Sequence, residues 1–145
     1  MNVLKSVLLE STEDNELEIL KDNYSKPSVE RFVEINKEKF WSYVTETENV
    51  YFYKVYNENT LSGTVQCEIY NRILYLAIVV FPDYQNKGIG TDIIKFVLDG
   101  RTGLDFKEIQ VSIDEKNTAS MKLFMNSGFV ETGKDGELID LQYIM

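Results

Sequence analysis

The chain has 145 residues, 43% of them hydrophobic and 27% charged, which is the composition of a folded globular protein of about one domain. It has no histidine and one cysteine, Cys67, which excludes Ser-His-Asp triads, histidine-containing metal sites and internal disulfides. The formal net charge of −9 disfavours nucleic acid and anionic membranes as partners, and it favours cationic ligands.

Residues 1–10 contain a short apolar run without a basic leader or a small-residue cleavage site, so they predict a first strand and not a signal peptide. No apolar stretch approaches the ~18 residues of a membrane span, and no repeat or linker interrupts the chain. We therefore expect residues 1–145 to form a single domain of a cytoplasmic protein, with no metal.

Two helices are expected after this strand. Ser11–Asp14 is typical of a helix start, because its side-chain oxygens can accept hydrogen bonds from free amides, and Leu17 and Leu20 would then face inward. A second helix would begin at Pro27 and end at Asn49. Its apolar residues lie near helical spacing: Val29, Phe32, Val33, Phe40, Trp41 and Val44.

An antiparallel meander is expected next, with strands at 50–56, 64–70 and 73–81. The turns would be 57–59 and the two-residue Asn71–Arg72. Because the strand at 73–81 is almost entirely apolar, we expect it to be buried on both faces.

Helices and strands alternate in the remaining chain. Helices are expected at 91–98 and 117–126, the second closed by Gly128, and strands at 109–113, 129–131 and 138–144. The order of elements predicts an α/β fold, with a mixed sheet and helices on both faces.

The segment Val80–Thr91 carries the clearest chemical signal, because a buried strand ends there and a glycine-containing loop leads into a helix. The first amides of a helix lack internal partners and favour an anion such as a pyrophosphate. Gly88 and Gly90 allow close approach of the backbone, and Lys87 adds a positive charge. The alternative is a plain strand–turn–helix connection that uses glycine only for its geometry.

Two common phosphate motifs do not match this segment. A P-loop needs Gly-Lys-Ser/Thr, whereas Thr91 and Asp92 follow Gly90, and a dinucleotide fingerprint needs a small residue at Ile93. The pattern Gln/Arg-x-x-Gly-x-Gly/Ala does match, from Gln85 to Gly90.

With this motif the chain resembles the GNAT superfamily of acyl-CoA-dependent N-acyltransferases. Asn117–Phe129 is similar to a second segment of that family, Asn-x-x-Ala-x-x-Leu-Tyr-x-x-x-Gly-Phe, and one strand separates the two. The resemblance implies a GNAT-like fold, in which a twisted, mostly antiparallel sheet is splayed between strands 73–81 and 109–113. It also implies an acetyl-CoA-dependent N-acetyltransferase, in which the acceptor amine attacks the thioester directly.

The resemblance implies a set of cofactor-binding residues. Backbone groups of Ile78, Val79 and Val80 would pair with the pantetheine arm, Asn117 would contact it from the other side, and Phe124 would pack near the sulfur. The pyrophosphate would be held by the loop residues Gln85, Asn86, Lys87, Gly88, Ile89, Gly90 and Thr91. The alternatives are purely structural roles: the side chains of residues 78–80 only pack in the core, and Asn117 is a helix N-cap.

The resemblance leaves the catalytic acid and base of this chain open. The backbone N–H of Val80 is a candidate oxyanion donor. Many family members have tyrosine as proton donor where this chain has Phe124, and some have a glutamate base where it has Ser112. Three alternatives remain open: water supplies the proton, another residue substitutes (Glu68, Tyr70, Tyr75 or Asp114), or the protein is a catalytically weak acyl-CoA-binding sensor or regulatory module.

Other residues have simpler interpretations. Cys67 is expected to be a core thiol and not a covalent acyl carrier, since no histidine can activate it. The aromatic run 51–56 and Trp41 either border an acceptor pocket or belong to the core. The acceptor is expected to be a primary amine of a small molecule or peptide, and the net charge favours a cationic one. A homodimer through residues 138–144 is a further possibility.

Overall fold

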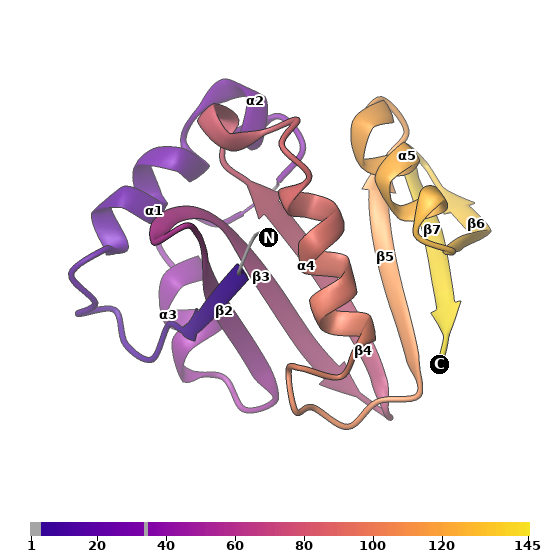
Figure 1. The fold of residues 1–145 in the computed structure, drawn as a ribbon, viewed down its shortest axis with the longest axis horizontal. Coiled ribbons are helices and arrows are strands. Elements are labelled where there is room, and N and C mark those ends of the chain that lie inside the picture. The colour runs from indigo at the N-terminus through magenta and orange to yellow at the C-terminus, as the bar shows by residue number, and fades with distance from the viewer. Residues whose placement is uncertain (1–3, 34) are drawn as a thin grey trace.

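Residues 4–33 and 35–145 are described by the computed structural model, and their strands form one seven-stranded sheet in the order β1-β2-β3-β4-β5-β7-β6 (Figure 1). All neighbouring strands are antiparallel except β4 and β5, which are parallel. In chain order the elements are β1 (Leu4–Leu8), α1 (Leu17–Tyr24), α2 (Pro27–Glu30), α3 (Phe40–Glu46), β2 (Val50–Asn57), β3 (Thr60–Tyr70), β4 (Ile73–Val80), the short 3₁₀ helix η1 (Pro82–Tyr84), α4 (Ile89–Leu98), β5 (Glu108–Asp114), α5 (Thr118–Asn126), β6 (Val130–Asp135) and β7 (Leu138–Ile144).

The helices cover the sheet from both sides, as expected. Figure 1 shows α4 and α5 in front of the strands and α1, α2 and α3 at the left of the view. The core beneath α4 and α5 is mainly aliphatic. The core beneath α1–α3 is aromatic, with the rings of Tyr24, Phe40, Trp41 and Phe52 packed at centroid distances of 4.9 to 6.3 Å. Trp41 and Phe52 are therefore core residues. This agrees with the second interpretation of these aromatic residues given above, that they belong to the core and do not border an acceptor pocket.

The expected single helix from Pro27 to Asn49 is wrong, since two short helices, α2 and α3, take its place. Asn36 provides the reason. Its Oδ1 accepts hydrogen bonds from the N–H groups of Glu38 and Lys39, and its carbonyl accepts from Phe40 N–H, so a new helix begins after it. Asparagine side chains satisfy free helix-start amides well, and this local preference outweighs the continuous apolar spacing.

The expected meander is confirmed, although β3 begins at Thr60 and not at residue 64. Glu58 and Asn59 both have positive φ (53° and 67°), which is the two-residue hairpin turn that brings Thr60 directly opposite Asn57. Asn71 and Arg72 form the second expected turn of this kind.

The expectation that the strand at 73–81 is buried on both faces is wrong. The side chains of Leu74 and Leu76 are buried against α4, but Tyr75 and Ala77 on the opposite side are exposed. Helices α1–α3 cover that side only near Val79 and Phe81. A long apolar run can thus have one uncovered face, because no helix within residues 4–33 and 35–145 packs over Tyr75 and Ala77.

The strand at 138–144 lies inside the sheet, so a homodimer cannot form by edge pairing of β7. β5 lies on one side of β7 and β6 on the other, and β6, whose residues are all exposed, forms the edge of the sheet.

The loop before α1 is fixed to β2 by a buried ammonium group. Lys54 Nζ lies 2.8 Å from Asp14 Oδ2 and 2.9 Å from Glu16 Oε1, and Tyr56 also donates a hydrogen bond to Glu16. Burial alone would lower the pKa of Lys54, but the hydrogen bonds to the two carboxylates outweigh it and raise that pKa. The buried charge is therefore paired, as burial requires.

Candidate functional site

Strands β4 and β5 separate along their length. They pair only at Ile73–Glu108, Leu74–Ile109 and Tyr75–Gln110, although β4 continues to Val80 and β5 to Asp114. On its other side β4 pairs with β3 along its whole length. Figure 1 shows the two strands close together at the bottom of the view and diverging toward the top. The expected splayed sheet is confirmed.

The parting leaves backbone groups of β4 without a strand partner. In an antiparallel pair, successive residues direct their N–H and C=O groups alternately to one neighbour and to the other. The N–H of Phe81 donates to Ser62 of β3 at 2.9 Å, so Val80 and Ile78 direct theirs toward β5, beyond the end of the ladder. An extended chain with amide groups could therefore pair with β4 here as an additional strand.

A cleft of about 430 Å³ lies at this end of β4. Three segments form its walls: the end of β4 with the loop into α4, the start of α5, and α2 with the residues after it. Most of the residues expected from the sequence line it, namely Ile78, Val79, Val80, Gln85, Asn86, Gly88, Ile89, Gly90, Thr91 and Asn117. The structure thus brings together two motifs that are separated by a strand in the sequence.

The N-terminus of α4 is open toward the cleft. Gly88, the N-cap, has φ +81° and carries no side chain that could cap the helix, and a Cβ there would meet no atom within 4 Å. Gly90 has a different role. A Cβ on Gly90 would lie 2.8 Å from Leu123 Cδ2, so this glycine lets α5 pack closely against the start of α4. Uncapped amides and the helix dipole favour an anion at this position.

Two polar side chains of the cleft have partners within the protein. Gln85 Nε2 donates to the carbonyl of Val80 at 3.0 Å, which ties the loop to the end of β4. Asn117 Oδ1 accepts from Ser120 N–H at 3.2 Å and so caps α5. Asn117 is therefore a helix N-cap that also lines the cleft.

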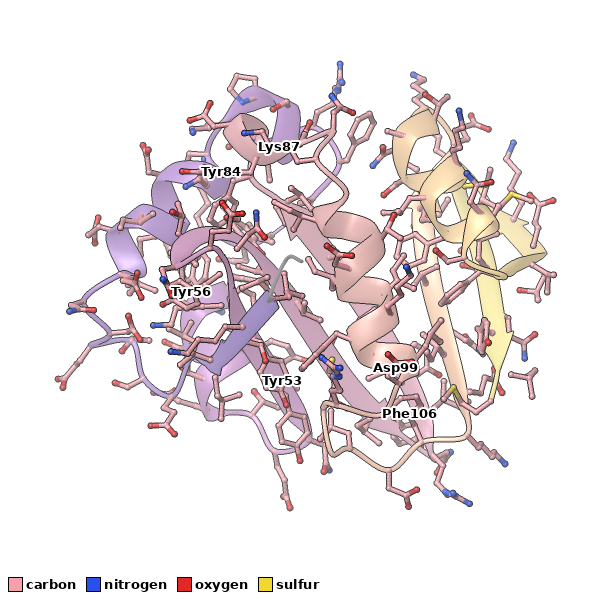
Figure 2. The ribbon with its side chains drawn as sticks, in the orientation of Figure 1. Tyr53, Tyr56, Tyr84, Lys87, Asp99 and Phe106 are labelled. Carbon is pink, nitrogen blue, oxygen red and sulfur yellow. The ribbon has the colours of Figure 1, made fainter. Side chains whose placement is uncertain are left out.

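Two of the expected cofactor-binding residues do not line the cleft. Lys87 is exposed, and its Nζ lies 5.7 Å from the centroid of the Tyr84 ring at the top of Figure 2. Phe124 is 3% exposed and packs edge-on against Phe129, with the ring centroids 5.0 Å apart. Its side chain belongs to the core beneath α5.

Sequence reasoning missed the wall formed by α2 and the residues that follow. Ser28, Val29, Arg31, Phe32 and Val33 line the cleft, and Arg31 is the one charged residue among the described lining residues. The guanidinium of Arg31 lies 4.5 Å from the ring centroid of Phe32. Only the tertiary arrangement brings Arg31 to the cleft, because no local motif links this residue to the glycine loop.

The candidate proton carriers Glu68 and Tyr75 lie elsewhere, opposite each other on β3 and β4 and on the side of the sheet away from α4. Tyr43 of α3 donates a hydrogen bond to Glu68, which raises the pKa of the Tyr43 hydroxyl. Ser112, at the position where some GNAT members have glutamate, donates to Asp140 Oδ1 at 2.7 Å. Neither Glu68 nor Tyr75 lines the cleft, and their catalytic role stays a prediction.

Cys67 is fully buried, and burial raises the pKa of its thiol to about 12, as expected for a core thiol. Within residues 4–33 and 35–145, no group of three or more acidic or cysteine side chains is placed to hold a metal ion. In the same part of the chain, no helix has the length and apolar character needed to cross a membrane.

A parted strand pair next to an uncapped helix start suits a long ligand that has amide groups along its length and an anionic group at one end. Residues 14–129 match the Acetyltransferase (GNAT) family, and the chain belongs to this family. No curated protein matches the sequence.

Solved structures share the fold at low sequence identity. A domain from Methanocaldococcus jannaschii DSM 2661 has 24% identity and a TM-score of 0.81, covering 99% of this chain and 100% of that one. Spermidine N-acetyltransferase from Vibrio cholerae, in complex with CoA and spermine, has 18% identity and a TM-score of 0.78, with coverages of 99% and 95%. Campylobacter jejuni N-acetyltransferase PseH, in complex with acetyl coenzyme A, has 13% identity and a TM-score of 0.73, with coverages of 98% and 99%.

Proposed function

We propose that residues 1–145 act as a single-domain N-acetyltransferase that transfers the acetyl group of acetyl-CoA to a primary amine in a ternary complex. The observation that carries this proposal is the coincidence, in one cleft, of the parted strands β4 and β5 with the uncapped start of α4. The membership of the GNAT family and the CoA complexes of two structural neighbours support the choice of acetyl-CoA.

The cleft fits the two chemically distinct parts of this ligand. The amides around Gly88 and Gly90 would bind the diphosphate, with Arg31 adding a positive charge from the opposite wall. The outward backbone groups of Ile78 would pair with amides of the pantetheine arm, and the outward N–H of Val80 stays available for the thioester oxygen. Acetyl-CoA supplies an acetyl thioester, whose acetyl group passes to an amine with release of the thiol.

The residues of the chain contribute mainly positioning and one hydrogen-bond donor. Holding both reactants in place can lower the barrier by about 7–11 kcal/mol. The N–H of Val80 points into the gap between the strands and would stabilise negative charge on the thioester oxygen. The proton that the amine nitrogen loses would pass to water, since Ala77 and Ser112 beside the gap are exposed to solvent. Water would also supply the proton that the leaving thiolate takes up, because Phe124 carries no hydroxyl that could donate one. No covalent acyl-enzyme is part of this proposal.

Calorimetry with acetyl-CoA and a thiol-release assay with a panel of amines test the proposal. We expect acetyl-CoA to bind and at least one primary amine to be acetylated. Binding without turnover on any amine would favour a sensor or regulatory module, and absence of binding would refute both functions. A cytoplasmic location belongs to the proposal, supported by the single free cysteine.

A further inference from the structure

The side of the sheet that faces away from α4 and α5 is largely uncovered between β3 and β7. We call it the open face and define it by the exposed and half-buried side chains Glu68, Tyr75, Ala77, Ser112, Asp140 and Ile144. These residues share one side because successive strand residues alternate and the registers place Glu68 opposite Tyr75 and Ser112 opposite Asp140. Their sequence neighbours Cys67, Leu74, Leu76, Val111 and Leu141 are buried on the other side, beneath α4 and α5.

The open face exposes aromatic and apolar groups. Tyr75 is 39% exposed, Tyr70 68% and Ile144 64%, and Tyr43 of α3 borders the face through its hydrogen bond to Glu68. The three strand spacings from β3 to β7 make the face about 15 Å wide. Exposed apolar surface of this extent, with tyrosines among polar groups, is typical of a protein interaction site.

The charge of the face is of one sign. The strands β3, β4, β5 and β7 contain no lysine or arginine, whereas Glu68 and Asp140 lie on the two sides of the gap between β4 and β5. A second copy of the chain is a poor occupant, since a two-fold contact would bring carboxylates against carboxylates. A small amine is also disfavoured, because small ligands bind in concave sites and the residues of the open face do not line the described cleft.

We propose that the open face docks a basic polypeptide segment, and that a lysine of this segment is the acetyl acceptor. This rests on the proposed function and narrows its substrate class. A lysine side chain is long and thin, and beyond Tyr75 and Gln110 the strands no longer pair. Its entry would lie between Ala77 and Ser112, whose side chains are small. Glu68 and Asp140 receive the cationic residues that flank the lysine, and Tyr75 packs against their aliphatic parts.

The test compares acceptors and variants on the intact protein. The acceptors are a short basic peptide with one internal lysine, the same peptide with its flanking arginines replaced by glutamate, cadaverine and spermidine. The variants are Glu68→Gln, Asp140→Asn and the double substitution. The matched control is Asp99→Asn, which removes the same charge after α4, at the lower right of Figure 2.

We expect the basic peptide to have the highest kcat/KM of the four acceptors. Each single substitution should raise its KM about threefold and the double substitution about tenfold, as for exposed ion pairs. Asp99→Asn should leave KM as it is. Added salt should raise the KM of the unsubstituted protein more than that of the double variant.

Binding measurements separate this proposal from the function on which it rests. Fluorescence anisotropy of the labelled basic peptide, with the protein saturated in CoA, should show the same dependence on Glu68 and Asp140 without any turnover. Peptide binding with no acetylation of any amine would refute the transferase and leave the docking surface standing. Acetylation of cadaverine or spermidine in preference to the peptide would overturn the docking surface and leave the transferase. A stable dimer that Tyr75→Arg dissociates would also overturn it, because a second copy would then occupy the face.

Discussion

Strand β4 pairs to different extents with its two neighbours, β3 and β5. Toward β3 it pairs from Ile73 to Val80, and toward β5 it pairs for three residues and then diverges. The paired side is held by close backbone packing, since a Cβ on Gly63 of β3 would lie 2.4 Å from the carbonyl oxygen of Val79. The open side is lined by the glycine loop and by α2. The comparison indicates that the continuous β3–β4 pair keeps the end of β4 in place, so that its other edge can remain free for a ligand.

The largest expected effect comes from breaking the paired side. Gly63→Ala should lower the free energy of unfolding by about 3 kcal/mol, because the added methyl group would overlap with backbone and not with a flexible side chain. Urea denaturation measures the change. Gly133→Ala is the control, since the nearest atom to its Cβ would be Asp140 Oδ2 at 4.0 Å. Equal stability of the two variants would show that the β3–β4 contact is not tight.

The edge of β4 that faces β5 is tested by a substitution at the start of α4, which lines the same cleft. Gly88→Asp should weaken acetyl-CoA binding about a hundredfold, roughly 2.7 kcal/mol, because a carboxylate would stand where the diphosphate is expected. Calorimetry checks the affinity. Gly103→Asp is a matched control, since both glycines have positive φ (81° and 73°) and open space around the Cβ position, while Gly103 lies outside the cleft. Both variants should lose about 1 kcal/mol of stability, and only the first should lose affinity.

The contact between β2 and the loop before α1, made by Lys54 and Asp14, should weaken at low pH. Burial alone would raise the pKa of Asp14, but the hydrogen bonds from Lys54 and from Glu16 N–H outweigh it and lower that pKa. Because the folded-state pKa is lowered, Asp14 stabilises the fold above the unfolded pKa of about 3.9, and this contribution is lost as the pH falls through the folded value.

Asp14→Asn should therefore be about 2 kcal/mol less stable than the unsubstituted protein at pH 7, with the difference shrinking below pH 4. Urea denaturation at pH 7, 5 and 3 checks this. A difference that stays constant with pH would mean that packing, and not the charge of Asp14, holds this loop.

The smallest expected effect concerns Gly90, which lets α5 pack closely against the start of α4. Gly90→Ala should cost about 1 kcal/mol of stability, because the methyl group would press on the flexible end of Leu123 at 2.8 Å. Leu123→Ala should remove this conflict, so a double-mutant cycle should give a favourable coupling between the two substitutions. Strict additivity would show that α5 moves away from α4 without cost.

Much of the fold could be predicted from local patterns. The hairpin turn at Asn71–Arg72 and the inward-facing Leu17 and Leu20 follow from turn chemistry and periodicity. The break between α2 and α3 was missed because the apolar spacing continues across it, and only the hydrogen bonds of Asn36 start the new helix. The burial of β4 was overestimated, since an apolar strand does not show whether a helix covers each face.

The candidate site was also predicted only in part: its local features followed from the sequence, and its packing did not. Most of the residues that the Gln85–Gly90 motif and its neighbours predicted for the site do line the cleft, because a helix start and its cap are local features. Arg31 was missed, and Phe124, which was expected near the sulfur, is buried in the core and does not line the described cleft. Both facts depend on how α2 and α5 pack, which no short motif records.

By itself the sequence determined the order of the strands, the glycine-rich helix start and the family, because these depend on neighbouring residues. The tertiary structure alone decided where the pairing of β4 and β5 ends, that α2 forms a wall of the cleft, and that one face of β4 and β5 stays open. These features arise from packing between segments far apart in the chain, where close contact at Gly63 and Gly90 and the number of available helices set the arrangement.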